Sequence, residues 1–465
     1  MYRMVHNLGY SAFLLTGLVF STHADTHSGV NTWSKIPLLG EVPGAGSGHD
    51  GHGFVTSRGQ LYVFGGYYGS SYLPPSNQLV VIDPGSGVCK RLDSYSGVTG
   101  NPPLATYSPA FAAWDGILYV LGGLSWVDTN YVHDFHAYEI GRKLWIRLDS
   151  SVGVTGFAPG PQGGMGLTAH DDSLWVTCGG GSSDTYQYDI NTRIWYVLSS
   201  SNIIRSSHVH SNLGTLLYVF GGYGGSVDGT IGYRNDIMAL DMGNRTAVWG
   251  TLTVHGEIPT PREHGTLVTV GQKLVLFGGM ASGKEDFDWT WVNDLFFFQP
   301  RTNEWVGVKN TGQMPSGRGR FGNAAVVGCS IYIFGGFFQI QQMGTRHLLQ
   351  GPFEAFDDLF RYQVAPEAGE DENCALCASG ATSCSLSTTP SPSEITPITT
   401  PVPDVNNGED KYTTVVVATV ISTLVVLVVL ASGGFYYVRR RQKTEDANEV
   451  QISVDGQVST MHVCL

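Results

Sequence analysis

One short pattern recurs six times in this chain of 465 residues: an apolar segment that ends in two consecutive glycines. The spacings between successive pairs are 57, 57, 42, 57 and 57 residues, measured between the first glycines Gly65, Gly122, Gly179, Gly221, Gly278 and Gly335. A fixed period of this length is the signature of a repeat architecture, in which each repeat folds as one unit and stacks on its neighbours. This regularity limits the possible folds more than any single motif does.

The residues around each glycine pair predict four short strands per repeat. A turn such as Ser57–Gln60 leads into the apolar strand that ends at the pair, and a loop then leads to a third strand such as Asn235–Asp241. A fourth strand follows around a tryptophan, as at Trp145. The glycine pair lets the backbone turn sharply and approach a neighbour closely, and the tryptophan offers a large apolar area for packing between repeats. The sequence therefore predicts an all-β, six-bladed propeller with one antiparallel sheet per repeat.

These features together resemble kelch repeats. The resemblance covers about residues Trp33–Val364, and its departures are small. Cys89 stands where the other repeats have tryptophan, and the short loop Gly181–Ser183 after the third pair accounts for the 42-residue spacing.

The order of the strands predicts how the ring closes. The sixth repeat has its third strand but no tryptophan after it, since the last one in the chain is Trp305. At the other end, Trp33–Ile36 matches Trp145–Leu148 of the second repeat. We therefore expect the N-terminal strand to supply the fourth strand of the sixth blade, which leaves no free edge there.

Two apolar segments predict a single-pass type I protein of the plasma membrane, with the N-terminal part outside. Residues 1–24 have the features of a signal peptide, with an apolar run too short to span a bilayer; an uncleaved anchor is the alternative. Residues 412–438 predict a transmembrane helix, because an uncharged stretch long enough to cross the bilayer is followed at once by three arginines at 439–441. The propeller is expected at 25–366, a stalk at 367–411 and a cytoplasmic tail at 439–465.

The charge of the chain limits the class of partner that it can bind, and its composition predicts covalent modifications. The signal segment and tail hold five of the 26 basic and four of the 39 acidic groups, which leaves 21 and 35 outside and a net charge of −14. This excess argues against nucleic-acid binding. The stalk is rich in Ser, Thr and Pro, which predicts an extended, O-glycosylated segment, and Asn244 begins a sequon for N-glycosylation. Cys374, Cys377 and Cys384 are an odd set, so one of them can pair with Cys329, whereas Cys89 and Cys178 are interpreted as buried small apolar residues.

The candidate ligand-binding surface is the face that carries the long loops after the glycine pairs, here called the long-loop face. Its aromatic side chains are candidates because exposed aromatic clusters make binding hot spots; they are Tyr67, Tyr68, Tyr72, Trp126, Tyr131, Tyr223, Tyr233, Trp289, Trp291, Phe337 and Phe338. Arginines that precede innermost strands near this face are candidates too, since kelch arginines at such places can bind ligand acids: Arg205, Arg262, Arg318 and Arg320. We expect only two blades to place arginine in matching register.

Two classes of function compete. The first is a cell-surface recognition protein that binds an extracellular protein or glycan through the long-loop face; the second is a membrane-tethered carbohydrate-active enzyme, such as a kelch-type oxidase or sugar isomerase. Catalytic motifs are absent from the sequence, so we favour a non-enzymatic protein without cofactor or metal. His208 and His210, with His49 and His52, could line the channel and bind a metal, but solvated or hydrogen-bonded histidines are the preferred interpretation.

Overall fold

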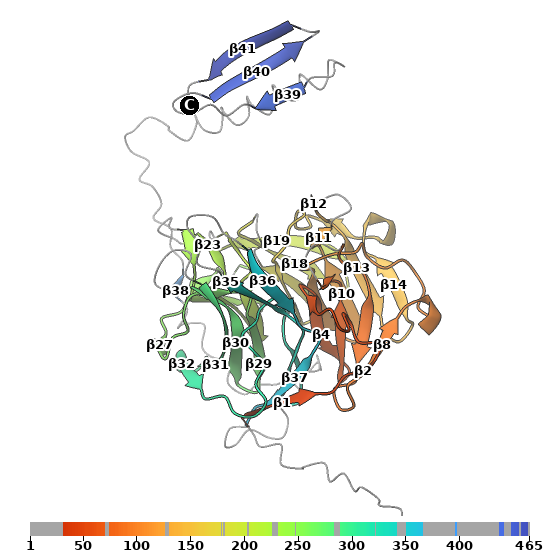
Figure 1. The fold of residues 1–465 in the computed structure, drawn as a ribbon, viewed down its shortest axis with the longest axis vertical. Coiled ribbons are helices and arrows are strands. Elements are labelled where there is room, and N and C mark those ends of the chain that lie inside the picture. Colours follow the sequence, from red (N-terminus) through yellow and green to blue (C-terminus); the bar gives the residue numbers. More distant parts are fainter. Residues whose placement is uncertain are drawn as a thin grey trace, which may run out of the picture. The chain divides into compact units, whose positions relative to one another are not determined.

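A computed structural model describes the protein (Figure 1). It describes residues 31–365 apart from 70–73, 126–129, 178, 180–181, 202–203, 226–230, 247, 283–288, 321 and 342–349, and further strands at 396–397, 437–440, 448–454 and 457–463. The chain divides into two compact units, Met1–Thr400 and Pro401–Leu465.

The first three repeats each form one sheet, whose strands are named below from the outermost to the innermost. The first blade comprises β2 (Leu39–Gly40), β8 (Val88–Leu92), β7 (Leu79–Ile82), β5 (Gln60–Phe64) and β4 (Gly53–Ser57). The second comprises β14 (Leu144–Arg147), β13 (Phe135–Glu139), β10 (Ile117–Leu121) and β9 (Ala110–Trp114). The third comprises β15 (Thr155–Gly156), β19 (Ile194–Ser200), β18 (Asp184–Asp189), β17 (Ser173–Thr177) and β16 (Gly166–His170).

The last three repeats follow the same plan. The fourth blade comprises β38 (Thr396–Pro397), β26 (Gly250–Thr251), β25 (Ile237–Asp241), β22 (Leu216–Phe220) and β21 (Val209–Leu213). The fifth comprises β27 (His255–Gly256), β32 (Glu304–Val308), β31 (Trp289–Gln299) and β30 (Lys273–Ser282), which pairs with both β29 (Thr266–Val270) and β28 (Arg262–Glu263). The sixth comprises β1 (Thr32–Ile36), β37 (Leu359–Gln363), β34 (Ser330–Phe334) and β33 (Ala325–Val327).

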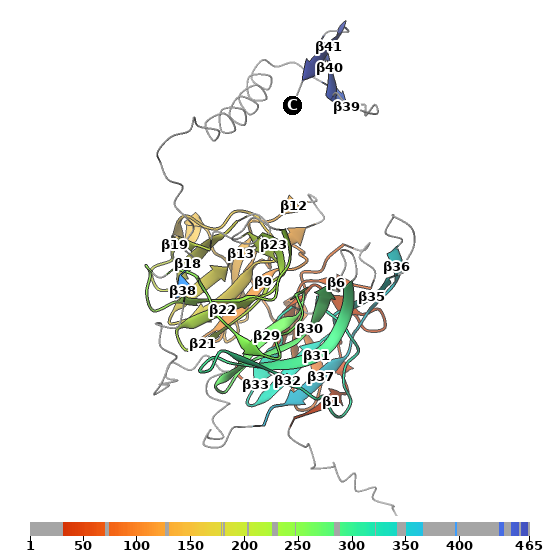
Figure 2. The same ribbon diagram turned by 90° about the vertical axis from the view of Figure 1, so that its left-hand side faces the viewer.

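The six sheets form a closed ring. Each innermost strand contacts the innermost strand of the next blade, and β33 of the sixth blade contacts β4 of the first. β1 pairs antiparallel with β37, from Thr32 opposite Gln363 to Ile36 opposite Leu359, and the two strands lie side by side in both views (Figures 1 and 2). The predicted six-bladed propeller, closed by the N-terminal strand, is therefore confirmed.

Six hydrophobic clusters hold the ring together, one at each interface between blades. Trp145 packs with Tyr62, Phe64 and Phe111 between the first two blades. Four other tryptophans fill the equivalent place at the following interfaces: Trp195, Trp249, Trp305 and Trp33. The interface of the sixth and first blades has Cys89 there, and this thiol is free and buried. The large ring and the small thiol thus occupy the same position of the repeat, as the sequence predicts.

The loops carry short elements of their own. Hairpins and small sheets are formed by β3 (His49–Asp50) with β6 (Tyr67–Tyr68), β11 (Leu124–Ser125) with β12 (Asn130–Tyr131), β35 (Phe337–Gln341) with β36 (Gln350–Ala355), and β20 (Arg205–Ser206) with β23 (Tyr223–Gly225) and β24 (Ile231–Tyr233). The β35–β36 hairpin extends away from the blades (Figure 2). Two 3-10 helices, η1 (Ser94–Ser96) and η2 (Ser150–Val152), follow the outer strands of the first two blades. In the second unit, β39 (Tyr437–Arg440), β40 (Asn448–Val454) and β41 (Gln457–Val463) make one antiparallel sheet.

The third blade corrects one expectation. From Gly179 to Trp195 the chain advances 16 residues, against 23 from Gly122 to Trp145, so the short loop removes only about half of the missing length. The other half is missing after the blade, where only residues 201–204 connect β19 to β20. The 42-residue spacing therefore has two causes, a short loop and a short linker.

Several predictions fall on residues outside those described. These are the signal peptide, residues 412–436 of the expected transmembrane helix and most of the stalk. Among the described residues, no helix is long and apolar enough to cross a membrane. Cys329 is disulfide-bonded, and its partner lies outside the described part of the chain. The domain boundaries and the type I topology stay predictions.

Candidate functional site

Each blade has one residue, here called the clamp residue, at the equivalent position before its glycine pair. The clamp residues are His49, Thr106, Gln162, Arg205, Arg262 and Arg318, each 16 or 17 positions before the first glycine of its own pair. Within the described chain, the backbone carbonyls of five clamp residues accept a hydrogen bond from the second glycine of the preceding blade, as from Gly222 N to Arg262 O at 2.8 Å and from Gly336 N to His49 O at 2.9 Å. In five of the six pairs both glycines have positive φ, which explains why glycine is required there.

The side chains of five clamp residues bind the first glycine of their own pair. In the first two blades the donors to the glycine carbonyls are His49 Nε2 at 2.6 Å and Thr106 Oγ1 at 3.2 Å. In the last three blades a guanidinium does the same at 3.0 to 3.1 Å, from Arg205, Arg262 and Arg318. Three blades, not two, therefore place arginine in matching register.

The three clamp arginines are also paired with the aspartate that leads into the third strand of their own blade. The pairs are Arg205–Asp236, Arg262–Asp294 and Arg318–Asp358, and each arginine side chain is 1% exposed. Arg318 additionally lies over the Phe356 ring, 3.8 Å from its centroid. A buried guanidinium that already holds a carboxylate and a carbonyl has few donors left for a ligand. We therefore assign these arginines a structural role, although the sequence offered them as ligand-binding candidates.

Two positions after each clamp residue, the chain forms a narrow ring around the channel, here called the mouth ring. Its members share a left-handed backbone, with φ between 52° and 68°: Gly51, Ser108, Gly164, Ser207, His264 and Arg320. Backbone hydrogen bonds link most of them across the blades, from Ser108 to Gly51, Gly51 to Arg320, Arg320 to His264 and His264 to Ser207, at 2.6 to 3.1 Å. Non-glycine residues adopt this conformation at a cost of about 1 kcal/mol or more, and such outliers concentrate at functional sites.

The mouth ring surrounds a pocket of about 100 Å³ on the channel axis. All six members of the ring line it, together with residues at the start of the innermost strands, among them His52, His208, His210 and Asn323. Among the described residues that line the pocket, Arg320 supplies the one permanent cation, its guanidinium.

Acidic groups surround Arg320. The carboxyls of Asp50 and Glu263 and the phenol of Tyr107 raise the pKa of Arg320, although burial alone would lower it. Burial raises the pKa of Asp50 and of Glu263 to about 7, while the Arg320 charge opposes that rise. Asp50 is 1% exposed, and neither carboxylate oxygen has a hydrogen-bond partner. The Phe337 ring covers the guanidinium at 5.1 Å, so Arg320 sits between an aromatic face and two carboxyls.

The channel histidines are neutral. Burial lowers the pKa of His49 and of His210 to about 4 and that of His264 to about 3, and it holds those of His52 and His208 well below the ordinary value. His208 Nε2 bonds Thr177 Oγ1 at 2.9 Å, and His210 Nε2 bonds Leu167 O at 3.2 Å. Within the described ranges, no three His, Cys, Asp or Glu side chains are arranged to hold a metal ion. All four candidate histidines are buried, and His49, His208 and His210 are hydrogen-bonded as interpreted. Neither ring nitrogen of His52 has a hydrogen-bond partner among the described residues.

The aromatic candidates of the fourth to sixth blades gather into one cluster. Trp291 and Phe337 are buried at its centre with Met280, and Tyr233, Trp289 and Phe338 pack around them. The rings of Trp291 and Phe337 lie 5.7 Å apart and those of Tyr223 and Tyr233 5.2 Å apart. Trp291 and Phe337 thus support the long-loop face from within, while Tyr223 remains 44% exposed on it.

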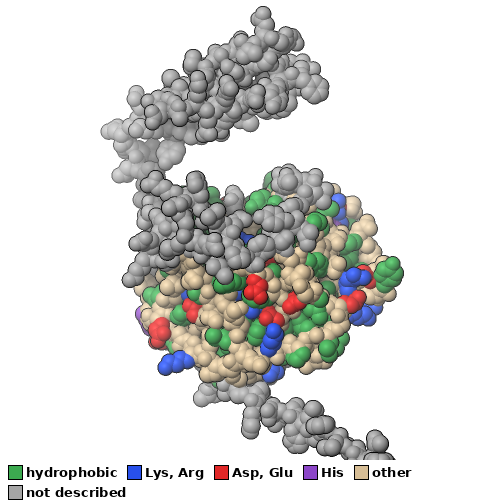
Figure 3. Space-filling view, viewed as in Figure 1, with side chains coloured by type: hydrophobic (Ala, Val, Ile, Leu, Met, Phe, Trp, Pro, Cys, Tyr) green, Lys and Arg blue, Asp and Glu red, His purple; other side chains and the backbone are tan. Residues whose placement is uncertain are grey.

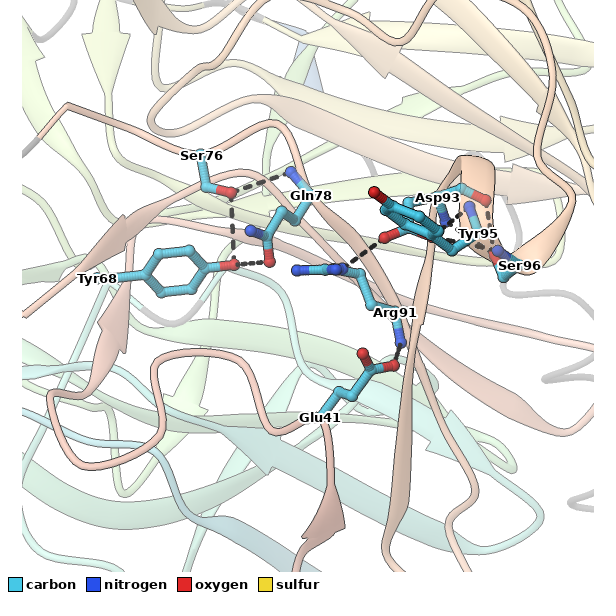
Figure 4. A network of polar contacts seen from close by, with 8 residues as sticks. All are labelled: Glu41, Tyr68, Ser76, Gln78, Arg91, Asp93, Tyr95 and Ser96. Atoms are coloured by element: carbon cyan, nitrogen blue, oxygen red, sulfur yellow. Dashed lines mark hydrogen bonds and ion pairs between the residues drawn. The ribbon is translucent and has the colours of Figure 1, made fainter.

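The aromatic candidates of the first two blades differ from one another in how far they are exposed. Tyr67 is buried and stacks on Tyr107 at 4.5 Å. Tyr68 is half-buried; its hydroxyl donates to Gln78 Oε1 at 3.0 Å in a polar network that also includes Ser76 (Figure 4). Tyr131 is 50% exposed, and Tyr72 and Trp126 lie outside the described residues. On the face seen in Figure 3, charged side chains are few and scattered among neutral and apolar ones.

Sequence reasoning missed several members of this site. Asp50, Tyr107, Ser207, Glu263 and His264 surround Arg320 or line the pocket, and none was a candidate. Their signal was present, because Ser207 and His264 follow their clamp residues by two positions and Asp50, Tyr107 and Glu263 by one. Finding it requires recognising histidine, threonine and glutamine as equivalents of a clamp arginine.

Comparison with known proteins gives the family. Two overlapping matches to the KLHDC2/KLHL20/DRC7 Kelch-repeats domain cover residues 18–222 and 204–365. Host cell factor 2 of Homo sapiens is 24% identical over 331 residues, which are 67% of this chain and 35% of that protein. Kelch domain-containing protein 3 of Homo sapiens is 28% identical over 44% of this chain and 56% of its own length, and acyl-CoA-binding domain-containing protein 5 of Arabidopsis thaliana is 27% identical over 51% and 37%. The chain thus spans between about a third and just over half of these relatives. Because the family match extends over more than half of its residues, the chain belongs to the kelch-repeat family.

Proposed function

We propose that this protein is a cell-surface recognition protein whose propeller binds an extracellular protein or glycan through the long-loop face. The observation that carries the proposal is the mouth ring: a strained, hydrogen-bonded ring presents the Arg320 cation beside an aromatic cluster. Rigid backbone that holds a charge next to aromatic rings is typical of a binding hot spot.

The size of the pocket favours recognition over catalysis. Pockets for small-molecule ligands usually enclose about 300–1,000 Å³, whereas about 100 Å³ admits little more than the end of one side chain or one sugar substituent. Asp50 has a raised pKa but is not among the residues that line the pocket. The match to the kelch-repeat family supports the use of the propeller as an interaction module.

The location in the plasma membrane rests on the sequence. The apolar residues 412–438 and the arginines that follow them support a single-pass anchor with the propeller outside. Asn244 is exposed in the turn between β25 and β26, and its Oδ1 accepts hydrogen bonds from Thr246 N at 3.0 Å and Thr246 Oγ1 at 2.8 Å. We propose that this sequon is glycosylated outside the cell.

A matched pair of variants tests the binding face. The wild-type protein is screened on cell surfaces and on a glycan array, and the strongest binder is then measured with Tyr131→Ser/Tyr223→Ser and with Tyr95→Ser. All three rings are exposed, but Tyr95 lies on η1 at the periphery of the first blade. We expect at least a tenfold loss of affinity for the double variant and none for Tyr95→Ser. Equal affinity of all three proteins would refute the proposed face.

A further inference from the structure

The outer edge of the fourth blade differs from the outer edges of the other five. In each of those blades, the linker from the preceding blade runs parallel to the outer strand and caps its edge. The caps are β2 on β8, Thr99 beside Leu144, β15 on β19, β27 on β32, and Gly312 beside Trp33. No linker residue of the described chain caps β26 in this way.

The missing cap has a cause in the sequence. The linker into the fourth blade consists of residues 201–204 only, whereas residues 93–105 and 148–161 enter the second and third blades. A linker this short must pass directly to β20 and cannot reach the outer strand. β26 itself has only two residues, against five in β32 of the next blade. The fourth blade therefore has a short outer strand whose backbone groups no linker satisfies, and an open edge of this kind invites another strand.

A segment from beyond the propeller pairs with this edge. β38 lies antiparallel to β26, with Thr396 opposite Thr251 and Pro397 opposite Gly250. It lies on the outside of the propeller (Figures 1 and 2). Proline lacks an N–H and is tolerated only in edge strands, so Pro397 suits the outermost position and discourages addition of a further strand.

We propose that the fourth blade carries a strand-addition site and that Thr396–Pro397 of the same chain occupy it as a clasp. The clasp closes the one edge that the repeat leaves open. It also shortens the tether of the propeller. If residues 412–438 anchor the chain, as proposed above, the spacer is reduced from residues 367–411 to 398–411, and its maximum reach falls from roughly 150 Å to about 50 Å. The strand pairing itself does not depend on the anchor.

Cross-linking in the full-length protein tests the clasp. In Thr251→Cys/Thr396→Cys the two thiols lie on directly paired residues, whereas in the matched control Thr251→Cys/Thr399→Cys the second thiol is three residues out of register. We expect most molecules of the first variant, and few of the second, to form the intrachain disulfide, as read by peptide mass spectrometry. Equal yields in the two variants, or no cross-link in either, would overturn the proposal.

Hydrogen exchange supplies a readout without new cysteines. Replacing Thr396–Pro397 by Gly-Ser is expected to speed amide exchange in Gly250–Thr251 at least tenfold and to leave β22 unchanged. Unaltered exchange at Gly250–Thr251 would show that nothing in this segment covers the edge. If the amides of Gly250–Thr251 in the Gly-Ser variant became protected again as the protein concentration rose, a second copy of the chain would be covering the edge of β26. Either result would refute the clasp.

Discussion

The buried arginine of the fifth blade allows a direct test of the clamp. Arg262 uses all of its donor positions: Nε and Nη2 bind Thr260 O and Oγ1, Nη1 binds Gly278 O, and Nη1 and Nη2 bind Asp294 at 2.6 and 2.9 Å. Arg262→Met removes these bonds and leaves the Gly278 carbonyl and the Asp294 carboxylate without their cation. Breaking a buried ion pair from one side costs about 3–5 kcal/mol of stability.

The partner substitution is expected to cost less. The Asp294 side chain is 38% exposed, so water can hydrate part of it. For Asp294→Asn we expect a loss of about 1–2 kcal/mol. The double variant should lose about as much as Arg262→Met alone, because the pair is already broken.

Urea and thermal unfolding, followed by tryptophan fluorescence, measure these losses. The loss for Arg262→Met corresponds to a Tm lower by roughly 4–7 °C for a propeller of this size. The matched control is Arg142→Met, since Arg142 pairs with Glu139 on the surface with a side chain that is 69% exposed and contributes well under 1 kcal/mol. If Arg262→Met were as stable as Arg142→Met, the clamp would not hold the blade, and Arg262 would again be a candidate for ligand binding.

Two further perturbations test other parts of the molecule. Lowering the pH from 7 to 5 is expected to destabilise the propeller, because unfolding lets seven histidines with lowered pKa values take up protons below their ordinary pKa of 6.5. The raised pKa values of Asp50 and Glu263 offset two of these protons, so the net effect is at most about 7 kcal/mol per pH unit. Urea titrations between pH 7 and pH 5 measure this change in the free energy of unfolding. We expect His210→Gln to weaken its dependence on pH and His133→Gln, at an exposed position, to leave that dependence unchanged. A free energy of unfolding that rises towards pH 5 would contradict the reasoning. Deleting residues 28–43 removes β1 and Trp33 and leaves the sixth blade without its outer strand, so we expect the cooperative thermal transition to disappear. An unchanged transition would show that β1 is not needed to close the propeller ring.

The fold was accessible from the sequence because its determinants repeat. Each glycine pair and each tryptophan occupies one position of the repeat, and the absence of a tryptophan after β37 pointed to β1 as the missing strand. The open edge of the fourth blade was not accessible, because it follows from the length of the linker 201–204 relative to the other linkers. That comparison needs strand ends, which sequence patterns locate poorly.

Which of the aromatic candidates are buried could not be predicted from the sequence either. Trp289 and Trp291 are two positions apart on β31, and alternate residues of a strand point to the same face. The pattern therefore predicts the same degree of burial for both rings. Trp291, however, is buried under Gly319, where an added Cβ would come within 2.5 Å of the Trp291 ring, while Trp289 is only half-buried. The difference arises from a neighbouring blade and not from the strand that carries the two residues.

Residues that stabilise the blade and residues that line the pocket are separated by two positions, from the clamp residue to the mouth-ring residue. Arg318 and Arg320 are chemically identical, but the chain turns left-handed at Arg320, with φ of 56°. Arg318 therefore turns into its own blade to bind Gly335 and Asp358, while Arg320 reaches the channel mouth. The clamp position can vary among histidine, threonine and arginine because it only has to donate to a carbonyl. The mouth position varies among glycine, serine, histidine and arginine because the ring is held by backbone hydrogen bonds, which do not depend on the identity of the side chain.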